Sequence, residues 1–318
     1  MIPLMLATFC YYLLRPLVNK LERPKLNRSL VILIIYLVFA ILLSIFIIVV
    51  FPLLRTQFYN LVNNAPNLLT SFGNKLEELE QNGFLASILP KDTSPLTQLT
   101  EYLNKGFSLL SNYVAGMFSF VSNFAVIILT FPILLFYMLK EGDKFGRKIV
   151  SFMPNRFRDE GRKVMKDIDH ALSGFIVGRV VVNVALGVLM YIGFLIIGLP
   201  YALLLTVISV IMNFIPFIGA ILSAIPIVII GLIESPSVAI WSLVVILVAQ
   251  QVQDNLISPY IFGKQLDIHP LTTIILVMVA SDAFGIIGMI VIIPVYMIVK
   301  IIVVKLYELF VKQKWEDA

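Results

Sequence analysis

Long apolar runs separated by short charged segments dominate the chain. Residues 30–54 and 113–139 carry no charged side chain, and each run is long enough to cross about 30 Å of hydrocarbon as one helix. A third uncharged run extends over 54 residues, from 180 to 233. As one straight helix it would reach about 80 Å at 1.5 Å per residue. This third run must therefore fold back on itself.

Glycine and proline indicate where the third run turns. A first helix is predicted over 174–198, and Pro200 follows its end. Pro216 and Gly219 then interrupt the apolar sequence and leave two halves of roughly 16 residues, because proline breaks a helix and glycine permits a turn. We predict a broken-helix hairpin over 200–233.

The C-terminal part of the chain repeats this pattern. A further helix is predicted over 237–254, and an apolar stretch over 271–304 follows it. Phe284, Gly285 and Gly288 interrupt this stretch. We predict that it forms a second broken-helix hairpin.

Composition agrees with a membrane protein. The chain has 318 residues, of which 59% are hydrophobic and 14% charged, against about 25% charged in an ordinary soluble domain. Its mean hydropathy is +0.97. A lone cysteine, Cys10, excludes an intrachain disulfide and a cysteine-cluster metal site, so we expect no metal.

Basic residues indicate the orientation. Five Lys and Arg lie in 15–28, nine in 140–166 and four from 300 onward, whereas 55–112 has four basic residues and five acidic ones. By the positive-inside rule the first three segments are cytoplasmic, as is the C-terminus, and 55–112 is extracytoplasmic. The net charge of +5 then reflects orientation in a bacterial cytoplasmic membrane, and we expect no nucleic-acid partner.

This orientation predicts the domain organisation. Each broken stretch must begin and end on the same side of the membrane. A helix followed by a hairpin that enters from outside therefore precedes a helix followed by a hairpin that enters from inside. That is an inverted repeat, common in secondary transporters; two pairs of short, tilted spans are the alternative. We expect N-terminal spans over 1–139, a cytoplasmic amphipathic linker over 140–173, a transport core over 174–304 and a tail over 305–318.

Two amphipathic helices are predicted in the extracytoplasmic arm 55–112, over about 58–79 and 96–110, because apolar residues recur there at helical spacing. They pack on each other or on the lipid surface, or else form a subunit contact. The fold class is thus an all-α membrane protein, a polytopic helical bundle with two broken-helix hairpins in an inverted repeat and extracytoplasmic amphipathic helices.

Motifs for ATP hydrolysis and for membrane-bound hydrolases are missing. The sequence has no G-x-x-x-x-G-K-[ST], H-E-x-x-H or G-x-S-x-G motif. We therefore expect a protein that is not an enzyme and has no cofactor. Transport by the chain alone then runs downhill or is coupled to a proton or sodium gradient.

Polar side chains near membrane depth are the candidate site residues, since a charge at the bilayer centre costs at least about 2.5–3.5 kcal/mol. Arg179 and Asn183 share one face of the first repeat's helix. On the second repeat's helix the candidates are Gln250, Gln251, Asp254 and Asn255. Asp254 could carry a proton or sodium ion, or simply end its helix. Arg179 could meet an anionic ligand, pair with Asp254, or extend towards the cytoplasm.

The hairpin tips supply the remaining candidates, because a broken helix frees backbone groups that can coordinate a solute. At the first tip they are Asn213, Pro216, Phe217 and Gly219. At the second they are Asp282, Phe284, Gly285 and Gly288. Asp282 alternatively caps a half-helix. His269 is expected to be a turn or capping residue rather than a proton relay.

Three blocks share their order and spacing with one known family. They are Asn213-Phe-Ile-Pro216-Phe-Ile-Gly219 with Pro226; Gln250-Gln-Val-Gln-Asp254-Asn255 with Pro259, Gly263 and His269-Pro270; and Phe284-Gly285-Ile-Ile-Gly288 with Pro294. On these residues the chain resembles the autoinducer-2 exporter family of bacterial membrane transporters. Relatives usually have another span before Ile2, a neutral polar residue at Arg179 and an acid at Gln253.

The resemblance implies a polytopic exporter in the lipid bilayer, a homo-oligomer such as a pentamer, and an elevator-like movement of the hairpin core. Our interpretation is a secondary transporter that exports a small polar solute, an autoinducer-2-like quorum-sensing signal. The alternatives are a sodium(lithium)/proton antiporter, which some similar proteins resemble, and a non-transporting membrane scaffold.

Overall fold

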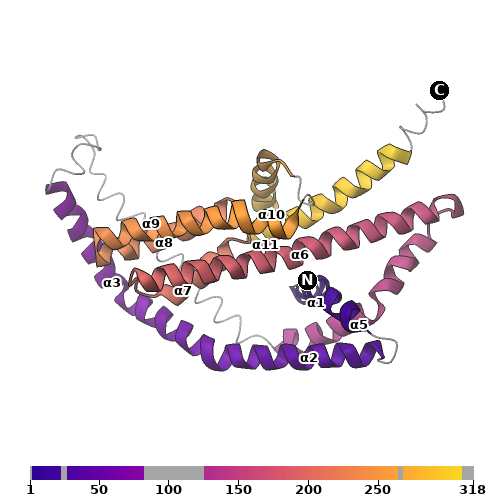
Figure 1. Cartoon of the computed structure of the whole chain (residues 1–318), viewed down its shortest axis with the longest axis horizontal. Coiled ribbons are helices and arrows are strands. Elements are labelled where there is room, and N and C mark those ends of the chain that lie inside the picture. Colours follow the sequence, from indigo (N-terminus) through magenta and orange to yellow (C-terminus); the bar gives the residue numbers. More distant parts are fainter. Residues whose placement is uncertain (1, 23–26, 82–124, 264–267, 310–318) are drawn as a thin grey trace.

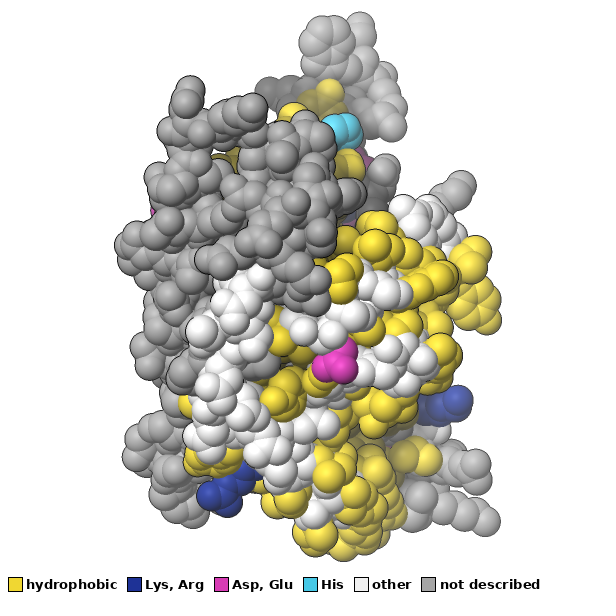
Figure 2. All heavy atoms as spheres, turned by 90° about the vertical axis from the view of Figure 1, so that its left-hand side faces the viewer, with side chains coloured by type: hydrophobic (Ala, Val, Ile, Leu, Met, Phe, Trp, Pro, Cys, Tyr) yellow, Lys and Arg dark blue, Asp and Glu magenta, His cyan; other side chains and the backbone are white. Residues whose placement is uncertain are grey.

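The computed structural model is helical throughout the residues that it describes, 2–22, 27–81, 125–263 and 268–309 (Figure 1). Four helical stretches are long and apolar enough to cross a membrane: Arg28–Asn64, Asn155–Ile196, Pro236–Phe262 and Pro270–Tyr307. Figure 2 shows hydrophobic side chains spread over much of one face, with few charged ones among them. The predicted all-helical, membrane-spanning class is confirmed at this level.

The N-terminal helices form one packing cluster. Helix α1 (Ile2–Leu21) packs against α5 (Ala125–Ser151), and both contact α2 (Arg28–Ile45). Side-chain hydrogen bonds to helix carbonyls support this packing, from Arg28 to Leu139 and from Tyr36 to Pro132. The buried members are Ala7, Tyr11, Leu14, Val18, Val31, Ile32, Ile35, Leu135 and Leu139.

Helix α2 continues without a turn into the segment 55–112, the predicted arm. A π-helical segment, Phe46–Val50, joins it directly to α3 (Phe51–Gln81), and Figure 1 shows them as one long curved rod. The span 30–54 and the start of the arm are therefore one helix. The second predicted amphipathic helix, 96–110, and the first half of the span 113–139 lie outside the described residues.

A second cluster holds the predicted transport core together. It combines α3 with α6 (Arg158–Ile196), α7 (Ala202–Met212), α8 (Ile218–Glu234) and α9 (Pro236–Val252). Its buried members include Leu54, Phe58, Leu61, Leu186, Met190, Phe194, Leu205, Ile227 and Ile246. In Figure 1, α8 and α9 lie side by side along α6 and α7.

The arm is also tied to the core by a hydrogen bond. Oε1 of Gln57 on α3 accepts from the backbone N–H of Leu204, in the first turn of α7, at 2.9 Å. The first N–H groups of a helix have no partner within the helix, so a side chain from another element caps α7 here.

The amphipathic segment 140–173 does not form helices of its own but belongs to the ends of two longer helices. Its first part is the end of α5 and its last part is the beginning of α6, which runs for 39 residues; a short turn at Asn155–Phe157 joins the two. A change from apolar to charged side chains does not by itself interrupt the backbone hydrogen bonds of a helix, so both helices continue through this segment.

The second broken stretch forms α11 (Pro270–Tyr307), which is interrupted at Gly285. Gly285 has φ 62° and ψ −148°, a conformation open to glycine, and Figure 1 shows the two parts of α11 running in different directions. The backbone of Ala280 lies against Gly288, although the two would be about 12 Å apart in a straight helix. His269 caps α11 by accepting from Leu271 N–H, as predicted.

Candidate functional site

The first hairpin places a polar cluster inside the apolar core. Asn213 follows the last residue of α7, Asn183 lies on α6, and Gln253 begins a π-helical segment, Gln253–Ile257, that follows α9. Their side chains are almost fully buried, with exposed fractions of 4%, 1% and 4%. Three amides buried together within apolar helices must satisfy one another or a ligand.

Asn213 is the centre of the hydrogen bonding. Its Nδ2 amide donates to Oδ1 of Asn183 at 2.8 Å and to Oε1 of Gln253 at 2.9 Å. Gln253 in turn donates from Nε2 to Oδ1 of Asp254 at 3.1 Å. The turn of the first hairpin is thereby linked to both long helices of the predicted repeat.

Arg179 lies one helical turn before Asn183 on α6, and its side chain points towards the turn of the first hairpin. Its guanidinium donates to the backbone carbonyl of Asn213. This carbonyl belongs to the C-terminal end of α7, where the last carbonyls lack partners within the helix and the helix dipole favours a cation. Arg179 is therefore held by the hairpin rather than extended to the cytoplasm, and it also interacts electrostatically with Asp254.

One donor of the cluster is left over. Nδ2 of Asn183 is buried and has no hydrogen-bond partner among the residues that the structure describes. Leaving such a donor unpaired costs about 1–3 kcal/mol. Together with the Arg179 guanidinium, it gives the cluster spare capacity for an oxygen-bearing guest.

Of the predicted residues of the second helix, only Asp254 joins this network, as the acceptor from Gln253. Gln250 is half-buried, while Gln251 and Asn255 are exposed and hydrogen-bonded to each other at 2.5 Å. Asp254 is exposed beside Gln253. It lies in the π-helical segment, and such local widenings of a helix frequently occur at functional sites.

The turn of the first hairpin is strained. Phe217 has φ 63° and ψ −54°, and the N–H of Ile218 donates to the carbonyl of Pro216 at 2.7 Å, so Phe217 is the centre of a γ-turn of the rare, strained type. Gly219 lies directly against the carbonyl of Met212, where no side chain fits. Such strain costs about 1–3 kcal/mol and collects at binding sites and switch regions.

This geometry predicts an unusual order of stabilities at position 217. Phe217→Gly and Phe217→Ala both remove the half-exposed ring, but glycine alone accepts the positive φ without strain. We expect the glycine variant to be the more stable by about 1 kcal/mol. Thermal unfolding of the two variants in the same detergent measures this difference. A more stable alanine variant would show that the turn does not have this conformation in solution.

The tip of the second hairpin is built differently. Asp282, Phe284 and Gly285 are exposed, and Gly288 is buried in the bend. No hydrogen bond or ion pair joins Asp282 to the Asn213 cluster within the described part of the chain. The structure thus brings Arg179, Asn183, Asn213 and Asp254 together.

Gln253 belongs to the cluster but was absent from the predicted site. A signal for it exists in the sequence: the buried positions of the helix before it are Ala239, Ser242, Ile246 and Ala249, and Gln253 continues their spacing of three and four. The apolar face of this helix therefore ends in an amide. Among the described residues no group of three or more His, Cys, Asp or Glu side chains is placed to hold a metal ion.

Comparison with known proteins covers nearly the whole chain. A sequence profile described as the AI-2E family transporter matches residues 1–308. The proposed transport protein YueF of Bacillus subtilis is 34% identical over 99% of this chain and 87% of its own length. The proposed permease PerM of Escherichia coli K12 is 26% identical over 95% of this chain and 86% of its own length.

Proposed function

The chain belongs to the AI-2E transporter family, and from this premise we propose that it is a secondary transporter that exports a small polar solute, an autoinducer-2-like signal. Family membership supports the transport of a solute across a membrane. The finer statements, on the cargo, the direction and the path, are our own inference from the site.

The observation that carries the proposal is the unpaired Asn183 amide next to the Arg179 guanidinium, inside the first hairpin. Both groups donate hydrogen bonds, so they suit a solute rich in hydroxyl or other oxygen acceptors. Asn213 connects the two groups, and its turn is strained and therefore able to change conformation at a modest cost.

We propose that the hairpin core moves past the N-terminal helices in an elevator-like manner. The two clusters of buried side chains support this, because they have no residue in common. The orientation that we propose has residues 140–173 and the C-terminus in the cytoplasm and the arm outside. By resemblance to relatives, the working unit is a homo-oligomer.

A sodium(lithium)/proton antiporter is the second candidate, and one observation favours it. Asp254 is an exposed carboxylate within the apolar stretch Pro236–Phe262, next to the buried cluster, and it interacts electrostatically with Arg179. A carboxylate so placed marks ion pathways in many membrane proteins. Asp254 would then exchange a proton for a cation.

Flux measurements in proteoliposomes separate the two functions. We expect the wild-type protein to release a labelled autoinducer-2-like solute and to move no protons after a sodium pulse. Asp254→Asn should slow solute release about tenfold, since it weakens a charge-assisted hydrogen bond to Gln253. Glu234→Gln, an equal loss of charge at the exposed end of α8, should leave release unchanged.

Proton movement driven by sodium alone, abolished by Asp254→Asn and kept by Glu234→Gln, would instead establish the antiporter. If neither flux responds to any change in the cluster, the protein is a membrane scaffold and the transport proposal is wrong.

A further inference from the structure

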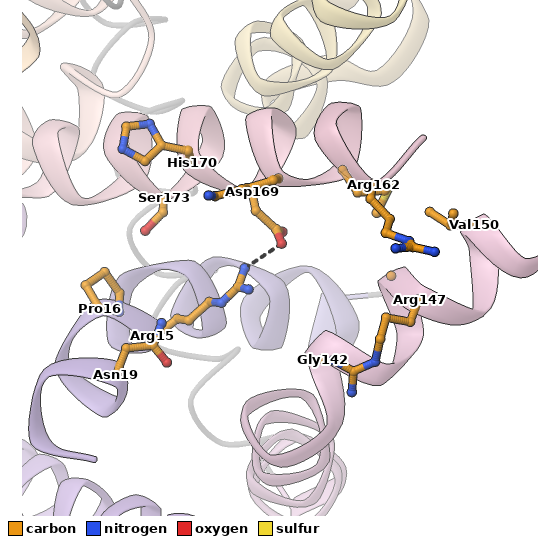
Figure 3. Close-up of a pocket in the computed structure, with 13 residues that line it drawn as sticks. Arg15, Pro16, Asn19, Gly142, Arg147, Val150, Arg162, Asp169, His170 and Ser173 are labelled. Carbon is orange, nitrogen blue, oxygen red and sulfur yellow. Dashed lines mark ion pairs between the residues drawn. The ribbon is translucent and has the colours of Figure 1, made fainter. Parts of the chain in front are cut away.

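A polar cavity that shares no residue with the Asn213 cluster lies beside the first half of α6. It has a volume of about 520 Å³ and lies between α1, α5 and α6. In Figure 3, Arg15 extends from α1 towards Asp169 on α6, while Arg162 on α6 and Arg147 on α5 lie at the other end, with Arg147 directed towards Gly142. No part of the proposed transport path uses this cavity.

The lining is strongly basic. Arg15, Arg147, Arg162 and Lys166 face one carboxylate, Asp169, so four positive charges against one negative leave a net charge of +3. A cavity with one sign of charge raises the local concentration of the opposite ion. The lining therefore favours an anion.

The carboxylate is already neutralised by its neighbours. Asp169 pairs with Arg15 at 2.8 Å and accepts from the hydroxyl of Tyr12 at 3.2 Å. The Ser173 hydroxyl donates to the carbonyl of Tyr12, which fixes α1 against α6 at this point. Asp169 thus acts as a positioning residue for Arg15, whose side chain is 16% exposed.

The remaining cations are free to bind a guest. Arg147 and Lys166 have no ion-pair or hydrogen-bond partner within the described ranges. Arg162 pairs with Asp159 at 3.3 Å, but both side chains are mostly exposed, and such surface pairs contribute about 0–1 kcal/mol. Three cationic groups of the lining, carried by two helices, are therefore available to a guest.

We propose that this cavity binds a phosphate group, carried by the head group of an anionic lipid or by a free phosphate. The guanidinium groups of arginine match phosphate oxygens with two parallel hydrogen bonds, and lysine adds a point charge. The volume lies within the usual range for ligand sites, about 300–1,000 Å³. The lipid source rests on the proposed orientation, which puts this cavity at the anionic cytoplasmic leaflet.

The test is binding to the purified full-length protein in an uncharged detergent. Native mass spectrometry measures the affinity for phosphatidylglycerol and, as the zwitterionic reference, phosphatidylcholine; equilibrium dialysis measures labelled inorganic phosphate. We expect phosphatidylglycerol to bind, and the double variant Arg147→Gln/Lys166→Gln to weaken it at least tenfold, since two charge-assisted contacts are lost. Binding of inorganic phosphate alone, weakened in the same way, supports the proposal with a free phosphate as the source.

Two matched variants control for charge and folding. Lys148→Gln/Lys163→Gln removes the same charge from the same two helices, at positions that do not line the cavity, and should bind as the wild type does. Arg147→Lys/Lys166→Arg keeps the charges and should retain binding. The proposal is overturned if neither probe binds, or if both glutamine variants weaken binding equally. Neither outcome depends on transport, so the proposed function is tested separately.

Discussion

Asn213→Ala is expected to abolish solute release while the protein remains folded. The substitution deletes the amide that donates to Asn183 and to Gln253 and leaves both acceptors buried. We expect a loss of about 1–3 kcal/mol in stability, since hydrogen bonds between membrane helices are worth somewhat less than in a water-soluble core. The Arg179 contact survives because it is made to the backbone carbonyl.

Thermal unfolding in detergent and release from proteoliposomes measure the two effects side by side. Asn255→Ala is the matched control, because this exposed amide bonds only to Gln251 among the described residues and its loss should cost under about 0.5 kcal/mol. If the Asn213→Ala variant releases solute as fast as the wild type, the buried amides are not part of the transport path.

Gly219→Ala is expected to have the largest effect on stability. An added Cβ would overlap the carbonyl of Met212, and a backbone atom at the end of α7 cannot move aside as a flexible side chain could. We expect a loss of about 3 kcal/mol or more, at the upper end of the cost of overpacking. The hairpin would have to open, so solute release should fall as well.

Gly73→Ala is the comparison for this substitution. Gly73 lies within α3, and a Cβ added there would have nothing within 4 Å, so alanine should be neutral or stabilise the helix by up to about 1 kcal/mol. Equal yields and melting temperatures for the two alanine variants would contradict the tight turn at Gly219.

The positions of the helix breaks could be predicted from the sequence, and the lengths of the helices could not. Pro216, Gly219 and Gly285 interrupt apolar runs, and the structure breaks at these points because each residue limits or frees the backbone locally. The boundary at 174 follows a change in polarity, whereas α6 extends 16 residues before it. A helix that leaves the membrane has no local reason to end at the surface.

The polar cluster was predictable in part. Asn213 and Asn183 were identifiable because each interrupts an apolar face, and the structure joins them. Gln253 is one of several polar residues within six positions, Gln250 to Asn255, and charge alone draws attention to Asp254. Which of these residues faces inward depends on the phase of α9 and on the π-helical segment after it. That phase is set by packing against α6 and α8.

One stretch of the rod formed by α2 and α3 is not covered by any other described part of the chain. From Leu37 to Val49 no side chain is buried, although α2 is anchored before it at Ile35 and α3 after it at Leu54. Within the described residues the apolar side chains of this stretch are left open to lipid tails, and a helix accommodates a mismatch with the hydrophobic thickness of the bilayer by tilting. Because the rod connects the two packing clusters, a thinner or thicker membrane would change the angle between them.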